Sequence, residues 1–289
     1  MHLRISPRDL GAMLVEPFCE RCYFYKAKLN FKLPFDRPMP GILHYLDRFE
    51  KTLVDTHFAE EGKLPAWLRT LGCESTVEFP EKMTQVFPKY DITMVGMPDA
   101  VFSKSNGELC LVDFKTAMNK GDNDPFMPIY KTQLLGYTHL LESNGIGEVD
   151  SAVLIYFENQ AKAYESKPLD LLTKQGFKMP FSVSIHEVEI DRSELEPLLK
   201  RFRKFADMDT APEGLMKCKN CARLEQLFDI ELGMRNQEDV LRHRDNYFRK
   251  VMQPVIDARR ERARNAWDLT QDEDQQSAEL EFFDFAPIY

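Results

Sequence analysis

Hydrophobic residues recur along this chain with two different periods. Between residues 42 and 60 they recur every three or four positions, which predicts a helix. From about residue 76 the period changes to two, and the segments 76–88, 91–102 and 107–117 each alternate as strands do. Turn residues separate these segments, the clearest being the SNG triplet that ends at residue 107. The pattern therefore predicts an antiparallel meander of three strands.

Helical and extended patterns continue on both sides of this meander. Ser6 followed by Pro7 is typical of a helix start, and Asp191 with Glu194 forms a near capping box for a later helix. The periods further predict a helix over 130–143, strands over 150–159 and 181–190, and a helix over 193–208. Helices on both sides of a mixed sheet predict an α/β fold.

Two charged residues interrupt one of the predicted strands. In LCLVDFKTA, at 109–117, side chains alternate between two faces, so Asp113 and Lys115 project to the same side. Cys110 projects to the opposite side, and we interpret it, like Cys73, as a core residue. Acids and lysines are seldom buried without a partner. Asp113 and Lys115 therefore either pair with each other or hold a ligand.

A second acid lies on the strand before them. In a meander consecutive strands are neighbours, so Asp99 of GMPDAVF can converge with Asp113 and Lys115. Two carboxylates beside a lysine form a hard-oxygen site suited to Mg²⁺ or Mn²⁺. Phosphodiester hydrolysis needs such a set, because the metal lowers the pKa of its water while the ammonium stabilises a developing oxyanion. The alternative for these residues alone is a surface ion-pair network.

Four motifs occur in a fixed order along the chain: GILHYLDRF, GMPDAVF, LVDFKTA and QLLGY. Together they resemble the motifs of the RecB-like branch of the PD-(D/E)XK nuclease superfamily, which includes the CRISPR-associated exonuclease Cas-four. The resemblance extends from about residue 6 to residue 224. It implies a restriction-endonuclease-like core, in which a central mixed β-sheet is flanked by helices and the N- and C-terminal segments are clasped by a metal or an iron-sulfur cluster.

The resemblance also implies a role for each motif residue. The catalytic residues would be Asp99, Asp113 and Lys115, and the metal ligands would be His44, Asp99, Asp113 and the main-chain carbonyl of Phe114. Gln133 and Tyr137 lie at i and i+4 on one helix face and would contact DNA or orient Lys115. His57 competes with His44, but only His44 has the G-x-x-H spacing. Core packing is the alternative for Tyr137.

Four of the six cysteines form two C-x-x-C pairs: Cys19 with Cys22, and Cys218 with Cys221. In an intracellular chain such pairs favour a metal ligand set over disulfides. Spacing alone fits [4Fe-4S] and tetrahedral zinc equally well. The resemblance favours [4Fe-4S], although the family typically has one early and three late cysteines where this chain has two and two.

Charge divides the chain unevenly. The formal net charge is −9, but residues 268–289 hold seven acids and no Lys or Arg, so the rest carries only −2. We therefore expect a nuclease domain over 1–232, a basic helical extension over 233–267 and an acidic aromatic tail over 268–289. Neither a membrane-length apolar run nor a signal-peptide core is present, which favours a cytoplasmic protein.

Two functions remain open. The first is a Mg²⁺- or Mn²⁺-dependent DNA nuclease, in the resemblance an exonuclease of DNA processing, recombination and repair, or CRISPR adaptation. The second is a DNA-end-binding assembly module in which cleavage is secondary. Both make DNA the partner, and the basic extension or the acidic tail could bind a partner protein in addition.

Overall fold

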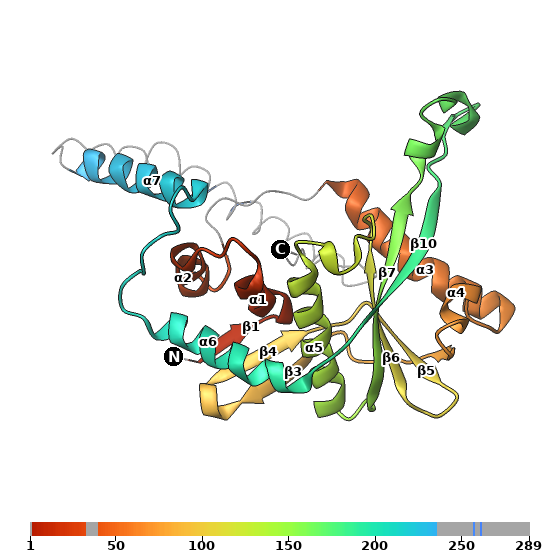
Figure 1. Ribbon diagram of the computed structural model, residues 1–289, viewed down its shortest axis with the longest axis horizontal. Coiled ribbons are helices and arrows are strands. Elements are labelled where there is room, and N and C mark those ends of the chain that lie inside the picture. The colour runs from red at the N-terminus through yellow and green to blue at the C-terminus, as the bar shows by residue number, and fades with distance from the viewer. Residues whose placement is uncertain (1, 33–39, 236–256, 258–260, 262–289) are drawn as a thin grey trace. The chain divides into compact units, whose positions relative to one another are not determined.

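The computed structural model describes residues 2–32, 40–235, 257 and 261 of the 289-residue chain (Figure 1). The chain divides into two units, Met1–Cys221 and Ala222–Tyr289, and the first holds every residue of the candidate sites. Nearly all of the expected basic extension and the whole acidic tail lie outside the described residues. No helix in the described part of the chain is both long and apolar enough to cross a membrane.

The first unit contains two β-sheets and the helices around them. The larger sheet has five strands in the order β10-β7-β6-β5-β2, and the smaller has the order β1-β4-β3. Within the larger sheet β6 and β7 are parallel and the other pairs are antiparallel. The central mixed sheet and its flanking helices confirm the α/β prediction. The strands of the two sheets are β1 (Leu3–Ile5), β2 (Cys73–Thr76), β3 (Met83–Phe87), β4 (Ile92–Gly96), β5 (Ala100–Lys104), β6 (Leu109–Lys115), β7 (Val149–Asn159) and β10 (Phe181–Val188).

Helices cover both faces of the larger sheet (Figure 1). On one face α5 (Met127–Ser143) packs with α1 (Pro7–Gly11) and α6 (Leu195–Asp207), and this core continues into the smaller sheet. On the other face α3 (Gly41–Glu61) and α4 (Ala66–Arg69) contribute to a separate core. The remaining α-helices in the described residues are α2 (Glu20–Lys28) and α7 (Lys219–Arg235).

Local sequence signals explain several of these elements. Ser6 caps α1, because its hydroxyl accepts a hydrogen bond from the main-chain N–H of Asp9 at 3.1 Å. Asp191 likewise accepts from the N–H of Ser193 at 2.9 Å at the turn that leads into α6. Gly136 lets α1 approach α5, since a Cβ atom there would lie 2.5 Å from Pro7.

The three-strand meander is wrong in its connectivity. The segment 91–102 is two strands, because β4 ends at Gly96, β5 begins at Ala100, and the strands belong to different sheets. Pro98 lies in the break and has no N–H for a sheet ladder, which explains why one strand cannot continue. The segment 76–88 likewise contains a strand chiefly at Met83–Phe87. The outcome is two hairpins, β3–β4 and β5–β6, one in each sheet.

The face assignment within β6 is confirmed. Leu109 and Leu111 lie in the core that contains α5, whereas Cys110 and Phe114 lie in the core that contains α3 and α4. Cys110 and Cys73 are both buried, as expected of core residues. Asp113 and Lys115 thus leave β6 toward α5.

Beyond the sheet, β7 and β10 continue as a two-stranded ribbon that carries residues 160–180 at its end (Figure 1). We call residues 160–180 the tip lobe. It contains two short 3₁₀ turns and a small hairpin of β8 (Leu172–Thr173) and β9 (Gly176–Phe177).

Candidate functional site

The end of β6 brings two carboxylates together. The register of β5 and β6 pairs Ala100 with Val112, so Asp99, just before β5, lies beside Asp113. The main-chain N–H of Phe114 donates to Asp99 Oδ2 at 3.0 Å. Because the strand is broken at Pro98, the side chain of Asp99, and not a main-chain carbonyl of β5, accepts the hydrogen bond from the N–H of Phe114 at the end of β6.

Each carboxylate also has a lysine. Lys115 Nζ forms an ion pair with Asp113 Oδ2, and Lys51 Nζ of α3 lies 2.8 Å from Asp99 Oδ1. Asp113 Oδ2 is buried, and Lys115 Nζ is the cation that contacts it. In the absence of a bound cation, the Lys115 ammonium balances the charge of this buried carboxylate.

Burial dominates the electrostatics of Asp113. Its side chain is 1% exposed. This burial, offset in part by the Lys115 ammonium and reinforced by the neighbouring charge of Asp99, raises the pKa of Asp113 to about 6. A bound cation would stabilise the ionised form of this buried carboxylate, because it would replace the hydration that burial removes.

Helix α5 presents three polar side chains to this site. Gln133 Nε2 donates to Asp113 Oδ1 at 3.0 Å and to the hydroxyl of Tyr137 at 3.1 Å. The predicted Gln133 and Tyr137 therefore lie together beside Asp113, one helical turn apart. Tyr137 also packs in the core that contains α5. It therefore makes both a packing contact in the core and a polar contact at the site. Tyr130, one turn earlier, lies with its ring centroid 4.5 Å from Lys115 Nζ.

His44 is not gathered with the two acids. It lies on the first turn of α3 and is exposed. In the described part of the chain it does not join Asp99 and Asp113 in a group whose ligand atoms all lie within 4.8 Å of one another. The competitor His57 has a local role, because its Nδ1 lies 3.0 Å from the carbonyl oxygen of Lys63. His44 as a metal ligand stays a prediction.

Three site residues were missed from the sequence: Glu50, Lys51 and Tyr130. Glu50 is buried, accepts a hydrogen bond from Thr116 at 2.7 Å, and has a pKa raised by burial and by nearby acids that include Asp99. A charged pair within a helix otherwise rich in apolar residues was the available signal for Glu50 and Lys51. Tyr130 could have been found from its position three residues before Gln133, because residues three apart on a helix lie on the same face.

The four paired cysteines form a second group, which we call the four-cysteine cluster. Their sulfur atoms all lie within 4.8 Å of one another. Cys19 Sγ is 3.4 Å from Cys221 Sγ, and Cys22 Sγ is 3.6 Å from Cys218 Sγ and 3.5 Å from Cys221 Sγ. The two pairs thus come from nearly opposite ends of the first unit's sequence, and together they could bind a metal ion or an iron-sulfur cluster.

Local structure favours a thiolate at one position of the four-cysteine cluster, Cys19. Cys19 and Cys22 lie at the start of α2, and Cys218 and Cys221 at the start of α7, where helix dipoles favour negative charge. Burial raises the pKa of Cys19, but hydrogen bonds from the main-chain N–H groups of Leu215 and Cys22 outweigh it and lower the pKa to about 6.

The backbone also fits closely around the four-cysteine cluster. A Cβ atom at Gly214 would lie 2.9 Å from Cys221 Sγ, so only glycine leaves room for that sulfur. Burial is the main reason that the pKa of Cys221 is raised, to about 11.

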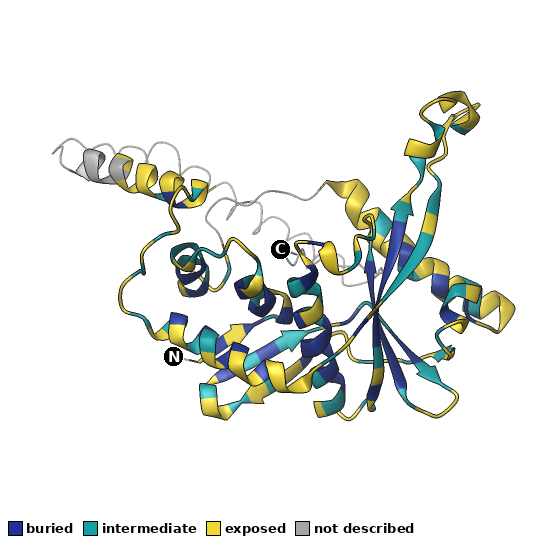
Figure 2. Ribbon diagram, viewed as in Figure 1, coloured by how far each residue is buried: buried dark blue, intermediate teal, exposed yellow. Residues whose placement is uncertain are grey.

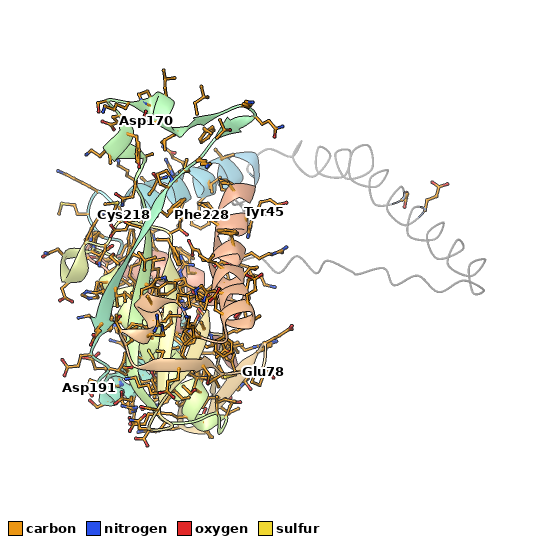
Figure 3. The ribbon with its side chains drawn as sticks, turned by 90° about the vertical axis from the view of Figure 1, so that its right-hand side faces the viewer. Tyr45, Glu78, Asp170, Asp191, Cys218 and Phe228 are labelled. Atoms are coloured by element: carbon orange, nitrogen blue, oxygen red, sulfur yellow. The ribbon has the colours of Figure 1, made fainter. Side chains whose placement is uncertain are left out.

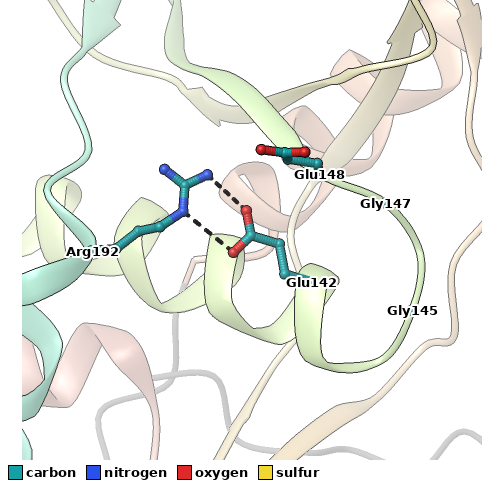
Figure 4. A pocket seen from close by; sticks show the side chains of 5 residues that line it. All are labelled: Glu142, Gly145, Gly147, Glu148 and Arg192. Atoms are coloured by element: carbon teal, nitrogen blue, oxygen red, sulfur yellow. Dashed lines mark hydrogen bonds and ion pairs between the residues drawn. The ribbon is translucent and has the colours of Figure 1, made fainter.

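A surface pocket lies away from both groups (Figure 4). It has a volume of about 390 Å³ and is found near the start of β7, at the opposite end of that strand from the tip lobe. Arg192 crosses it to bind Glu142 Oε1 at 2.7 Å and the carbonyl oxygen of Val149 at 2.8 Å. These charges satisfy one another, so we assign this pocket a structural role and not the chemistry.

Comparison with known proteins leaves the family open. No protein-family model matches the chain, and no curated protein matches it. A solved structure described as "Crystal structure of SSO0001" aligns with 70% of this chain and 76% of its own length, at 14% identity and a TM-score of 0.37. A similarity of that size carries no conclusion about function.

Proposed function

We propose that this protein is a Mg²⁺- or Mn²⁺-dependent DNA nuclease with a restriction-endonuclease-like core. One observation carries the proposal: Asp99 and Asp113 converge at the end of β6 with Lys115 beside them, and Gln133 fixes the orientation of Asp113. If these residues were only surface charges, nothing would require them to lie together. Their contacts therefore support a shared role for the D-x-K and Q-x-x-x-Y motifs.

The residues present fit a divalent cation. Asp113 is a buried carboxylate whose Oδ2 contacts a cation, the Lys115 ammonium, and the second carboxylate, Asp99, lies beside it. In an extended strand the N–H and C=O of one residue point to the same edge, so the carbonyl of Phe114 faces the edge where its N–H meets Asp99. Asp99, Asp113 and the Phe114 carbonyl would hold the ion, which is a hard-oxygen ligand set.

When bound, the ion would activate a water and neutralise charge on the scissile phosphate. The protein side chains supply the rest. Lys115, freed from Asp113 Oδ2, would stabilise the developing oxyanion, since an ammonium in a poorly hydrated site acts strongly on nearby charge. Gln133 holds Asp113 Oδ1, and the Tyr130 ring restricts where the Lys115 ammonium can lie.

One observation supports the DNA-end-binding module as a second candidate. Lys51 and Lys115 each pair with one of the two aspartates, so protein groups alone supply a cation for each of these carboxylates. A site of this kind could contact phosphates through its lysines while cutting slowly.

Cleavage of end-labelled DNA with excess Mn²⁺, and with chelator, tests the proposal. Lys115→Ala should abolish cutting. The matched control is Lys104→Ala, since Lys104 also forms an ion pair with an acid and has nearly the same exposed fraction, 17% against 16% for Lys115. Parent protein that binds DNA ends without cutting them would support the second candidate. Cutting by Lys115→Ala at the parent rate would contradict the catalytic assignment.

For the four-cysteine cluster we propose a single tetrahedral ion of the zinc class. Around one Zn²⁺ with Zn–S bonds of about 2.3 Å, the sulfurs stand about 3.8 Å apart. The observed separations of 3.4, 3.5 and 3.6 Å are close to this spacing. A [4Fe-4S] cluster, which the sequence resemblance favoured, places four irons between its ligands and holds the sulfurs farther apart.

Metal analysis of protein purified without air tests this second proposal. One zinc and no iron per chain is the expected result. Four irons with the visible absorbance of a cluster would contradict it, and the absence of both metals would remove the clasp altogether.

A further inference from the structure

The tip lobe exposes most of its side chains. Figure 2 shows it mostly exposed, and Asp170 marks its position in Figure 3. Main-chain hydrogen bonds hold its shape, such as Lys178 N–H to the Leu171 carbonyl and Gln160 N–H to the Pro180 carbonyl, both at 2.9 Å. Four large apolar side chains remain exposed to solvent: Leu169 at 76%, Leu172 at 63%, Phe177 at 72% and Met179 at 48%. Apolar groups gathered on a small projection mark a binding surface.

Lysines alternate with these apolar groups. Residues 160–180 contain Lys162, Lys167, Lys174 and Lys178 but only two acids, Glu165 and Asp170, so the tip lobe carries +2 in a chain of net charge −9. None of the four lysines forms an ion pair with another described residue. Free cationic groups beside exposed apolar ones are suited to a ligand that is both anionic and flat.

The tip lobe stands on the same edge as the candidate site. Lys115 of β6 pairs with Tyr156 of β7, and β7 runs only as far as Asn159 before the tip lobe begins. Three residues of strand span about 10 Å, so the tip lobe begins within the length of a few nucleotides from Lys115. The loop after β6 is fixed to this ribbon, since Asn119 N–H donates to Glu158 at 2.8 Å and its side chain to Ser184 at 3.2 Å.

From these observations we infer that the tip lobe binds an unpaired segment of the DNA strand whose phosphate lies at Asp99 and Asp113. The lysines contact phosphates, and Phe177 stacks on a base. Unpaired bases present the flat apolar faces that Phe177 needs, whereas a duplex stacks its own bases. A protein partner is less well matched, because protein interfaces are poor in lysine. The inference rests on the proposed function and deepens it by naming single-stranded DNA as part of the substrate.

Fluorescence anisotropy of one labelled oligonucleotide, as a single strand and as a blunt duplex, tests the inference. An Asp113→Asn background without metal separates binding from cutting. Phe177→Ala should weaken single-strand binding about tenfold and duplex binding less than about twofold, and Phe177→Trp should restore it. Val86→Ala, another exposed apolar position, is the control and should change neither.

The charge component has its own measurement. Lys174→Gln together with Lys178→Gln should reduce the slope of log affinity against log salt by about 1.4 for the single strand. Lys82→Gln, an exposed lysine outside the tip lobe, is the control.

Two results would overturn the inference. One is equal binding of the single strand by the parent and by Phe177→Ala. The other is a change in oligomeric state with unchanged DNA affinity, which would make the tip lobe a contact between copies of the chain. Cleavage by the parent is scored separately, so a parent that binds single strands through Phe177 but never cuts would refute the nuclease proposal alone.

Discussion

The four-cysteine cluster should carry a large part of the stability of the first unit. Its two pairs are far apart in sequence, with a separation of 196 residues between Cys22 and Cys218 and of 202 between Cys19 and Cys221. An ion bound by all four thiolates therefore closes a loop that contains almost every strand and helix of this unit. Removing the ion, or replacing Cys218 by serine, opens that loop.

The size of the effect follows from loop-closure entropy. In the chain-entropy model, a cross-link that closes a loop of about 200 residues removes about 5 kcal/mol of unfolded-state entropy at 25 °C. Domains of this kind have total stabilities of about 5–15 kcal/mol. Loss of the ion should thus remove a third or more of the free energy of unfolding.

Urea denaturation followed by far-UV circular dichroism measures this difference. The parent should lose about 5 kcal/mol when a chelator strips the ion. Cys218→Ser should start near that lower value and not respond to chelator. Cys73→Ala is the control, because it removes a buried thiol outside the four-cysteine cluster and should still respond to chelator by the same amount as the parent.

One result would contradict this role of the four-cysteine cluster. If the parent is shown to hold one ion and its free energy of unfolding does not change when that ion is removed, the two pairs do not close the loop in the folded protein.

Three further predictions concern single side chains. Burial raises the pKa of Asp113 to about 6, so ionisation of this carboxylate costs stability as the pH rises from about 4 through 6. Asp113→Asn should then raise the free energy of unfolding of the metal-free protein by about 3 kcal/mol at neutral pH, a gain that disappears near pH 4 in a denaturation series. Gln133→Ala should slow cleavage about 10–100-fold, whereas Tyr137→Phe should slow it less than about threefold if the ring mainly packs in the core; comparable losses would refute that division. Gly214→Ala should release the ion from the four-cysteine cluster at lower chelator concentrations, because the added methyl group meets a sulfur at 2.9 Å, whereas Gly41→Ala meets nothing within 4 Å and should retain the ion as the parent does.

Local patterns in the sequence were enough to predict the parts of the fold that depend on neighbouring residues. The alternation in LCLVDFKTA predicted the correct faces of β6, and the Ser6–Pro7 pair marked the correct helix start. Gln133 and Asp113 could be related only through the resemblance, because their contact joins a helix to a strand 20 residues away.

Other features depend on tertiary packing that the sequence does not display. Alternation alone made 91–102 one strand, since a period of two says nothing about which sheet a residue joins. The helical period at 42–60 was correct, but Glu50 and Val54 are its buried residues, while Phe49 and other apolar residues are exposed. Amphipathic spacing therefore did not predict the buried face of α3, and it left Glu50 out of the candidate site.

The order in which the chain is synthesised determines when the four-cysteine cluster can form. Cys22 leaves the ribosome 196 residues before Cys218, which at about 5–20 residues per second is an interval of about 10–40 s. Both carboxylates and both hairpins are made within that interval, while the first cysteine pair has no partner pair. Coordination of an ion by all four thiolates would consequently be among the last events in the maturation of this unit. A chain released before residue 218 would contain both carboxylates of the candidate site but only one of the two cysteine pairs.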